Sequence, residues 1–161
     1  MACTYCVGAP DFEIKRYSYW AVYLKKNQAY PGTCIVALNR HVGDLWQCTP
    51  EELSELHVIM SRLAEVLKET FSAKMFSYVG QVSLENLHAT MQIIPRYSER
   101  IKIGNYVFDD TTFGRGYDPI KMKELDPPMY SQLILKIKEK LGSDQPSHKE
   151  EPEVPLPDEQ L

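Results

Sequence analysis

The sequence has no long apolar run, no recognisable secretion signal and no internal repeat. None of its apolar runs approaches the roughly 20 residues that a membrane-spanning helix needs. The first residues lack the charged and apolar regions of a signal peptide. These absences predict a protein of the cytosol that has no membrane partner.

The chain also lacks a cysteine framework and a strong excess of positive charge. In a cytosolic protein, its four cysteines are more readily metal ligands or free thiols than disulfides. The net charge is −4 overall and −5 for residues 143–161, so residues 1–142 carry about +1. This argues against a nucleic-acid partner held by bulk electrostatics. A local basic patch of Lys25, Lys26, Arg40 and Arg96 could still hold a few phosphates.

Composition divides the chain into two parts. Residues 1–142 have the length of one ordinary domain and contain aliphatic and aromatic residues throughout. Residues 143–161 are rich in proline and acids and have few large apolar side chains. We therefore predict one folded domain over 1–142 and a disordered acidic, proline-rich tail over 143–161.

Hydrophobic periodicity predicts an α+β fold with a mostly antiparallel sheet, one long helix packed on one face and a short C-terminal helix. Between residues 98 and 128 the periodicity fails, and this part reads as an irregular loop. With its glycines, Arg115 and Tyr117, it could be a lid or an interface, or else ordered packing or disorder. The predicted strands cover 19–26, 32–39, 75–82 and 87–95, and the predicted helices begin at 50 and at 128.

The long helix has the clearest start signal. Thr49 can cap it, Pro50 suits its first position, and Glu52 completes a capping box. Apolar residues then recur at helical spacing over five or six turns. They are Leu53, Leu56, Met60, Leu63, Leu67 and Phe71.

The segment "NLHATMQIIPRY", residues 86–97, has polar residues at alternating positions. In an extended strand His88, Thr90 and Gln92 share one face, and apolar side chains occupy the other. Pro95 removes a backbone donor and usually marks a strand end or an edge. Three polar groups on one strand face indicate a functional site.

Cys3 and Cys6 form a C-x-x-C pair, whose spacing allows two thiolates to bind one tetrahedral metal ion. His41, just after a predicted strand, and His88 remain as partners by elimination, because the other histidines lie on the helix and in the tail. The alternative is that the cysteines are free thiols at the chain end and the histidines are ordinary polar residues.

The stretch from Cys3 to Tyr97 resembles the histidine triad superfamily of nucleotide-handling proteins, whose motif strand reads His-x-His-x-His or His-x-His-x-Gln. Within that superfamily the pattern is similar to the zinc-bearing branch of galactose-1-phosphate uridylyltransferase. This resemblance implies a histidine triad fold, a homodimer, a nucleotide or nucleotide-sugar ligand, and a zinc ion. The implied zinc ligands are Cys3, Cys6, His41 and His88.

The chain departs from the family at the reacting group. The family's central motif histidine attacks the α-phosphate, and Thr90 stands at that position here. A threonine hydroxyl needs a general base, whereas a neutral imidazole is nucleophilic near pH 7. Gln92 cannot usefully accept a proton, although it can donate to a phosphate oxygen.

The expected ligand contacts also come from the resemblance to the histidine triad superfamily. Lys25 stands where the family often has an acid that binds ribose, so ribose recognition is in doubt, but a lysine can meet a phosphate. We take Asn39, Arg40, Gln92 and Arg96 as candidate nucleotide-binding residues.

Three functions remain open from the sequence. The first is a zinc-containing nucleotide-binding protein in which nucleotidyl transfer is lost or impaired. The second is an active nucleotide phosphohydrolase or nucleotidyltransferase that acts on a nucleoside phosphate ester. The third is a zinc-stapled scaffold whose acidic tail recruits a partner. We favour the first because of Thr90 and Lys25, and leave enzyme activity undecided.

Overall fold

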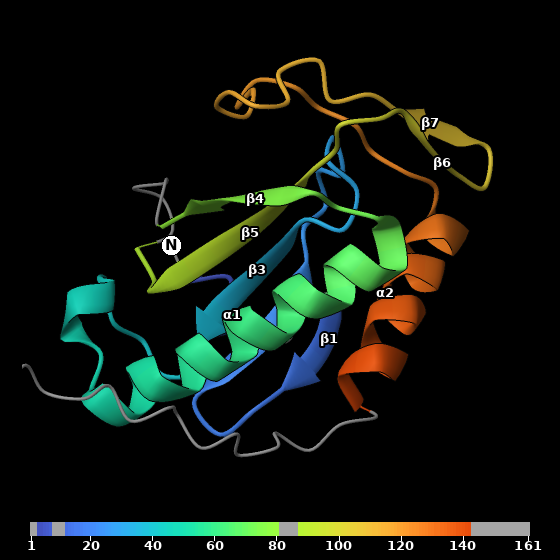
Figure 1. Cartoon of the computed structure of the whole chain (residues 1–161). Helices are drawn as coiled ribbons and strands as arrows, with labels where there is room; N and C mark the ends of the chain where they lie inside the picture. The colour runs from blue at the N-terminus through green and yellow to red at the C-terminus, as the bar shows by residue number, and fades with distance from the viewer. Residues whose placement is uncertain (1–2, 8–11, 81–86, 143–161) are drawn as a thin grey trace, which may run out of the picture.

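A sheet of five strands carries two helices on one face (Figure 1). The computed structural model describes residues 3–7, 12–80 and 87–142. The strand order is β1-β2-β3-β5-β4, and every pairing is antiparallel. The elements are β1 (Glu13–Arg16), β2 (Trp20–Leu24), β3 (Cys34–Leu38), α1 (Pro50–Phe71), β4 (Met75–Val79), β5 (Thr90–Arg96), β6 (Ile101–Ile103), β7 (Tyr106–Phe108) and α2 (Pro127–Gly142), with a 3-10 turn at Leu45–Gln47.

This arrangement confirms the predicted α+β class, the antiparallel sheet, the long helix and the short C-terminal helix. The predicted tail, residues 143–161, lies outside the described residues. In the described part of the chain, no helix combines the length and the apolar content that crossing a membrane would require.

Helix α1 begins as the sequence predicted. The Thr49 side chain accepts from the Glu52 amide, and the Glu52 carboxylate accepts from the Thr49 amide, so the capping box is complete. The buried face of the helix differs in part from the predicted stripe. Leu53 is exposed and Met60 is half-buried, whereas Ile59 and Val66 are buried.

The core lies between the sheet and both helices. Helix α1 crosses one face of the sheet, and α2 packs beside it against β1 (Figure 1). Alternate strand residues point into this layer, as the twofold period of a strand requires. They include Trp20, Val22, Leu24, Cys34, Val36, Leu38, Ala89 and Ile93.

The opposite sheet face carries the polar residues of the motif strand. Thr90 and Gln92 in β5 lie on this face, and Ala37 and Ile35 pair with them from β3. We call this surface the open face. Tyr5, from the N-terminal segment, packs on it against β2 and β3.

Proline 95 does not end the motif strand, which continues to Arg96. Strand β3 pairs with β5 only as far as Ile93, so the missing Pro95 amide faces no β3 acceptor. On its other side Pro95 pairs in register with Phe76 of β4. The proline therefore sits where one neighbouring strand has already ended.

One strand was missed, and one prediction about an irregular region was wrong in part. Strand β1 was not predicted, and it forms the sheet edge beside β2. Residues 98–128 contain the hairpin β6–β7, which stands apart from the main sheet (Figure 1). Each missed strand has only three or four residues, too few to show a period.

The loop after β7 is packed on the body by specific contacts. The guanidinium of Arg96 binds Asp110 and the carbonyls of Thr112 and Arg115. Further along, the Gln28 amide donates to the Lys123 carbonyl. The loop is therefore ordered packing, one of the alternatives that the sequence left open.

Candidate functional site

Four side chains from three separate segments converge at one end of the open face. Cys3 and Cys6 come from the N-terminal turn, where the Cys6 amide donates to the Cys3 carbonyl. His41 follows β3, and His88 precedes β5. One ligand atom from each of these four residues lies within 4.8 Å of the other three. The structure therefore brings together the four residues that the sequence selected.

The distances within this cluster match the edges of a tetrahedral metal site. Bonds of about 2.3 Å to sulfur and 2.0–2.1 Å to nitrogen place sulfur and nitrogen about 3.6 Å apart, and two nitrogens about 3.3 Å apart. Here Sγ of Cys3 and of Cys6 lie 3.3 and 3.6 Å from Nδ1 of His88. The two Nδ1 atoms of His41 and His88 lie 3.2 Å apart. The arrangement is a candidate metal site with two sulfur and two nitrogen ligands.

His88 is fixed in the orientation that ligation requires. Its ring is 0% exposed, and its Nε2 lies 2.6 Å from the Leu38 carbonyl, which can only accept. Nε2 therefore carries the proton and Nδ1 directs its lone pair at the cysteines. Burial lowers the pKa of His88, outweighing the Leu38 hydrogen bond that raises it, and this favours the neutral ring.

The residue between the two cysteines also belongs to the site. The Tyr5 ring lies 5.3 Å from the His88 ring and 5.7 Å from the Tyr23 ring, centre to centre. Burial raises the pKa of the Tyr5 phenol. Tyr5 was not among the predicted site residues, although any residue between two ligands of one ion must lie beside that ion.

The two other polar residues of the motif strand follow the cluster along the open face. Thr90 is 8% exposed and Gln92 is 6% exposed. The Lys25 ammonium donates to the Gln92 side-chain carbonyl over 2.8 Å. Burial lowers the pKa of Lys25. Lys25 therefore meets Gln92, which lies on the same strand face as Thr90, as the strand pattern predicted for Gln92.

The other candidate nucleotide-binding residues have partners within the protein. Asn39 donates to the Tyr17 carbonyl, and Arg40 forms a bidentate ion pair with Glu52. Arg96 is 0% exposed and faces Asp110. The structure does not bring these three residues to Gln92, and their role in binding stays a prediction.

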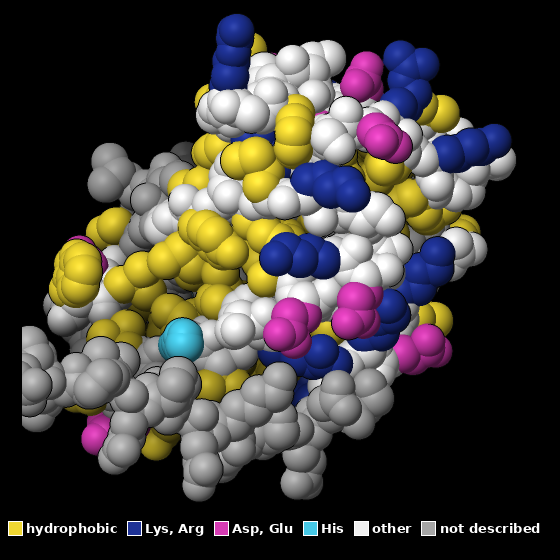
Figure 2. All heavy atoms as spheres, viewed as in Figure 1, with side chains coloured by type: hydrophobic (Ala, Val, Ile, Leu, Met, Phe, Trp, Pro, Cys, Tyr) yellow, Lys and Arg dark blue, Asp and Glu magenta, His cyan; other side chains and the backbone are white. Residues whose placement is uncertain are grey.

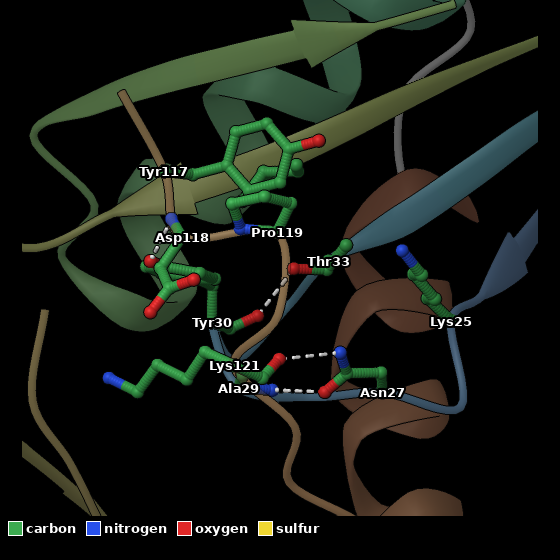
Figure 3. Close-up of a pocket in the computed structure, with 10 residues that line it drawn as sticks. Lys25, Asn27, Ala29, Tyr30, Thr33, Tyr117, Asp118, Pro119 and Lys121 are labelled. Atoms are coloured by element: carbon green, nitrogen blue, oxygen red, sulfur yellow. Dashed lines mark hydrogen bonds between the residues drawn. The ribbon is translucent and has the colours of Figure 1, made fainter. Parts of the chain in front are cut away.

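A small pocket continues the open face beyond Gln92 (Figure 3). Its volume is about 30 Å³. Lys25, Tyr30 and Thr33 line it from the turn between β2 and β3, Ile94 from β5, and Tyr117 from the loop after β7. The sequence pointed to Tyr117 only as part of a loop that could form a lid or an interface, and tertiary contacts place it beside the motif strand.

Solved structures share this architecture at low sequence identity. A hypothetical histidine triad nucleotide-binding protein from Sulfolobus tokodaii matches with a TM-score of 0.66 and 18% identity, covering 87% of this chain and 92% of its own. The chain has the histidine triad fold. A Zn-bound histidine triad family protein from Mycobacterium smegmatis matches with a TM-score of 0.59 and 15% identity, over 89% of this chain and 98% of its own.

A diadenosine triphosphate hydrolase from Plasmodium falciparum has the same fold. It matches with a TM-score of 0.61 and 14% identity, over 87% of this chain and 84% of its own. No family model and no curated protein matches the sequence. The histidine triad fold is therefore established by three-dimensional similarity, and the predicted fold is confirmed.

Proposed function

We propose that this protein binds a nucleotide or nucleotide sugar on the open face and has lost nucleotidyl transfer. The observation that carries the proposal is the polar row of His88, Thr90 and Gln92, with the four-ligand cluster at one end and Lys25 at the other. Lys25 supplies a cation and Gln92 an amide donor, the groups that a phosphate would need.

Zinc is the metal that this donor set fits best. Two thiolates and two imidazoles in a tetrahedral arrangement are typical of structural zinc. A zinc ion with four protein ligands keeps no open position, so it would supply folding energy by joining the N-terminal turn to His41 and His88. Tyr5 would then stay packed on His88 at that end of the open face.

The loss of transfer activity follows from the surroundings of Thr90. Its hydroxyl would need a base to become a nucleophile. In His88, Nε2 already donates to Leu38 and Nδ1 faces the cysteines, so neither nitrogen is available to take the proton. Gln92 cannot act as a base.

We also propose a homodimer that forms along β4. This strand is the last in the order β1-β2-β3-β5-β4, so one side of its backbone has no strand partner in the described chain. Met75 and Tyr78 on β4 and Val58 on α1 are exposed. Figure 2, viewed as in Figure 1, shows apolar side chains gathered over β4 and α1. Tyr78→Glu should shift the protein towards the monomer in light scattering, whereas Tyr19→Glu, at an exposed turn, should not.

A cytosolic location completes the proposal. All four cysteines are free in the structure, and the two that would bind zinc need a reducing compartment to remain thiolates.

The decisive test compares the native chain with Thr90→His in a single-turnover reaction. Both zinc-loaded proteins are incubated with an α-phosphate-labelled nucleotide sugar and with a dinucleoside tetraphosphate. We expect the native chain to bind ligand without label transfer and Thr90→His to become labelled. Thr111→His, at an exposed position in the loop, is the matched control.

The possible outcomes separate the functions. Label transfer or product from the native chain would make this protein an enzyme, the second candidate from the sequence. Absence of ligand binding by both proteins, with zinc present and the fold intact, would favour the scaffold instead.

A further inference from the structure

We infer that the pocket beside Gln92 binds a second anionic group of the ligand, and that Tyr117 is a recognition residue in it. The inference rests on the proposed function, because the first phosphate is taken to lie at Lys25 and Gln92. It adds a substrate class, because the site should bind ligands with two adjacent phosphates, such as nucleoside diphosphates, more tightly than nucleoside monophosphates.

The pocket is a direct extension of the candidate ligand site. Ile94 in its floor is two residues beyond Gln92 on the same strand face, and Lys25 belongs to both places. A group attached to a phosphate at Gln92 can therefore enter the pocket without crossing any element of the fold.

The Lys25 ammonium lacks an anionic partner. Its hydrogen-bond acceptor is the neutral Gln92 carbonyl, and among the described residues no carboxylate lies within ion-pair distance of it. A partly desolvated ammonium is stabilised by an anion far more than by an amide oxygen. Two of its three hydrogens remain for a ligand.

The Tyr117 hydroxyl is a second donor without a protein acceptor. In the described part of the chain this hydroxyl makes no hydrogen bond. The Tyr117 ring packs edge-on against the Tyr30 ring, with the two ring centres 6.4 Å apart. Figure 3 shows the hydroxyl directed towards the side of the pocket where Thr33 and Lys25 lie. The Tyr30 hydroxyl also accepts from the Asp118 amide at 2.8 Å, and this bond fixes the backbone next to Tyr117.

The other charged groups of the pocket face elsewhere. The Asp118 carboxylate accepts from the Ile120 amide, and Figure 3 shows it on the side away from Lys25. The Lys121 ammonium donates to the Asp109 carbonyl and also points away. The inner wall therefore presents donors from Lys25 and Tyr117, the pattern that selects an anion.

The loop that carries Tyr117 is pre-organised for this role. Asn27 donates to the Lys121 carbonyl and accepts from the Lys123 amide, and these contacts hold the loop to the turn before Thr33. A wall fixed before binding loses little entropy when the ligand enters.

The test measures AMP and ADP affinity by calorimetry on the full-length, zinc-loaded protein. We expect the native chain to bind ADP about tenfold more tightly than AMP, the contribution of one hydrogen bond to a charged group. Tyr117→Phe removes only the hydroxyl and should abolish most of this difference while leaving AMP affinity unchanged. Tyr19→Phe, at the far end of β2, is the control and should change neither.

The outcomes distinguish the two proposals. Equal affinity for AMP and ADP in the native chain, or a Tyr117→Phe variant that keeps the ADP preference, overturns the pocket inference and leaves the nucleotide site in place. Equal weakening of both nucleotides by Tyr117→Phe also overturns it. If neither nucleotide binds the native chain, both proposals fail together.

Discussion

The two ends of the motif strand are joined to distant parts of the chain in opposite ways. His88, before the strand, meets Cys3, Cys6 and His41, which offer only sulfur and nitrogen electron pairs. Arg96, at the other end, meets the carboxylate of Asp110. The Arg96 end is therefore complete within the protein, whereas the His88 end has the donor atoms of a candidate cation site.

The Arg96 network leaves no guanidinium nitrogen without an acceptor. Nε and one terminal nitrogen bind the two Asp110 oxygens at 2.7 and 2.9 Å. The remaining acceptors are the hydroxyls of Ser77 and Thr112 and the carbonyls of Thr112 and Arg115. Because both partners are buried, removing one would leave an uncompensated charge.

The largest effect should come from breaking the buried Arg96–Asp110 ion pair. Arg96→Met leaves the Asp110 carboxylate buried without its partner, and we expect a loss of about 3–5 kcal/mol in the free energy of unfolding, measured in urea. The double variant Arg96→Met with Asp110→Leu should recover much of this loss. If Arg96→Met and the native chain have the same midpoint of unfolding in urea, the ion pair does not hold the loop.

Removing the metal should have the next largest effect. A ligand present at 100 to 1,000 times its Kd stabilises a fold by about 3–4 kcal/mol, so chelation or Cys3→Ser should lower the melting temperature measured with zinc. Cys48→Ser is the matched control, since Cys48 lies outside the cluster. A native chain whose melting is insensitive to both zinc and chelator would contradict the proposed site.

Acid should weaken the Arg96 end only at low pH. Burial raises the pKa of Asp110, but the Arg96 hydrogen bonds and the Tyr97 amide lower it more, so the net pKa is lowered. A lowered native pKa gives stability that is complete above the unfolded value of about 3.9 and is lost as pH falls through the native one. The difference in the free energy of unfolding between the native chain and Asp110→Asn should be constant from about pH 7 to 5 and should decrease below about pH 4. A difference in the free energy of unfolding that already narrows between pH 7 and 5 would contradict a lowered pKa of Asp110.

The smallest effect should come from an exposed pair beside the same loop. Arg100 and Asp109 lie 3.5 Å apart, and both side chains are exposed. Arg100→Met should change the free energy of unfolding by less than about 1 kcal/mol in the same urea titration, because water already solvates both charges. A loss as large as that of Arg96→Met would mean that burial is not what separates the two pairs.

Sequence pattern was sufficient where the signal is local. The capping box at Thr49 and the alternation from His88 to Gln92 each depend on neighbouring residues, and both match the structure. Short strands such as β1 gave no such signal. The partners of Arg40 and Arg96 could not be read from the chain either, because Glu52 and Asp110 are not adjacent to them in sequence.

By itself, the sequence determined the α+β class and the long helix, because hydrophobic periodicity is a property of the local chain. It also selected the four residues of the candidate metal site, Cys3 and Cys6 by their C-x-x-C spacing and His41 and His88 by elimination and family resemblance. Only the tertiary structure decided that Arg96 faces Asp110, that Lys25 meets Gln92, and that Tyr117 lies beside the motif strand. The physical reason is that long-range contacts arise when separate segments pack together, and no local pattern encodes which side chains then meet.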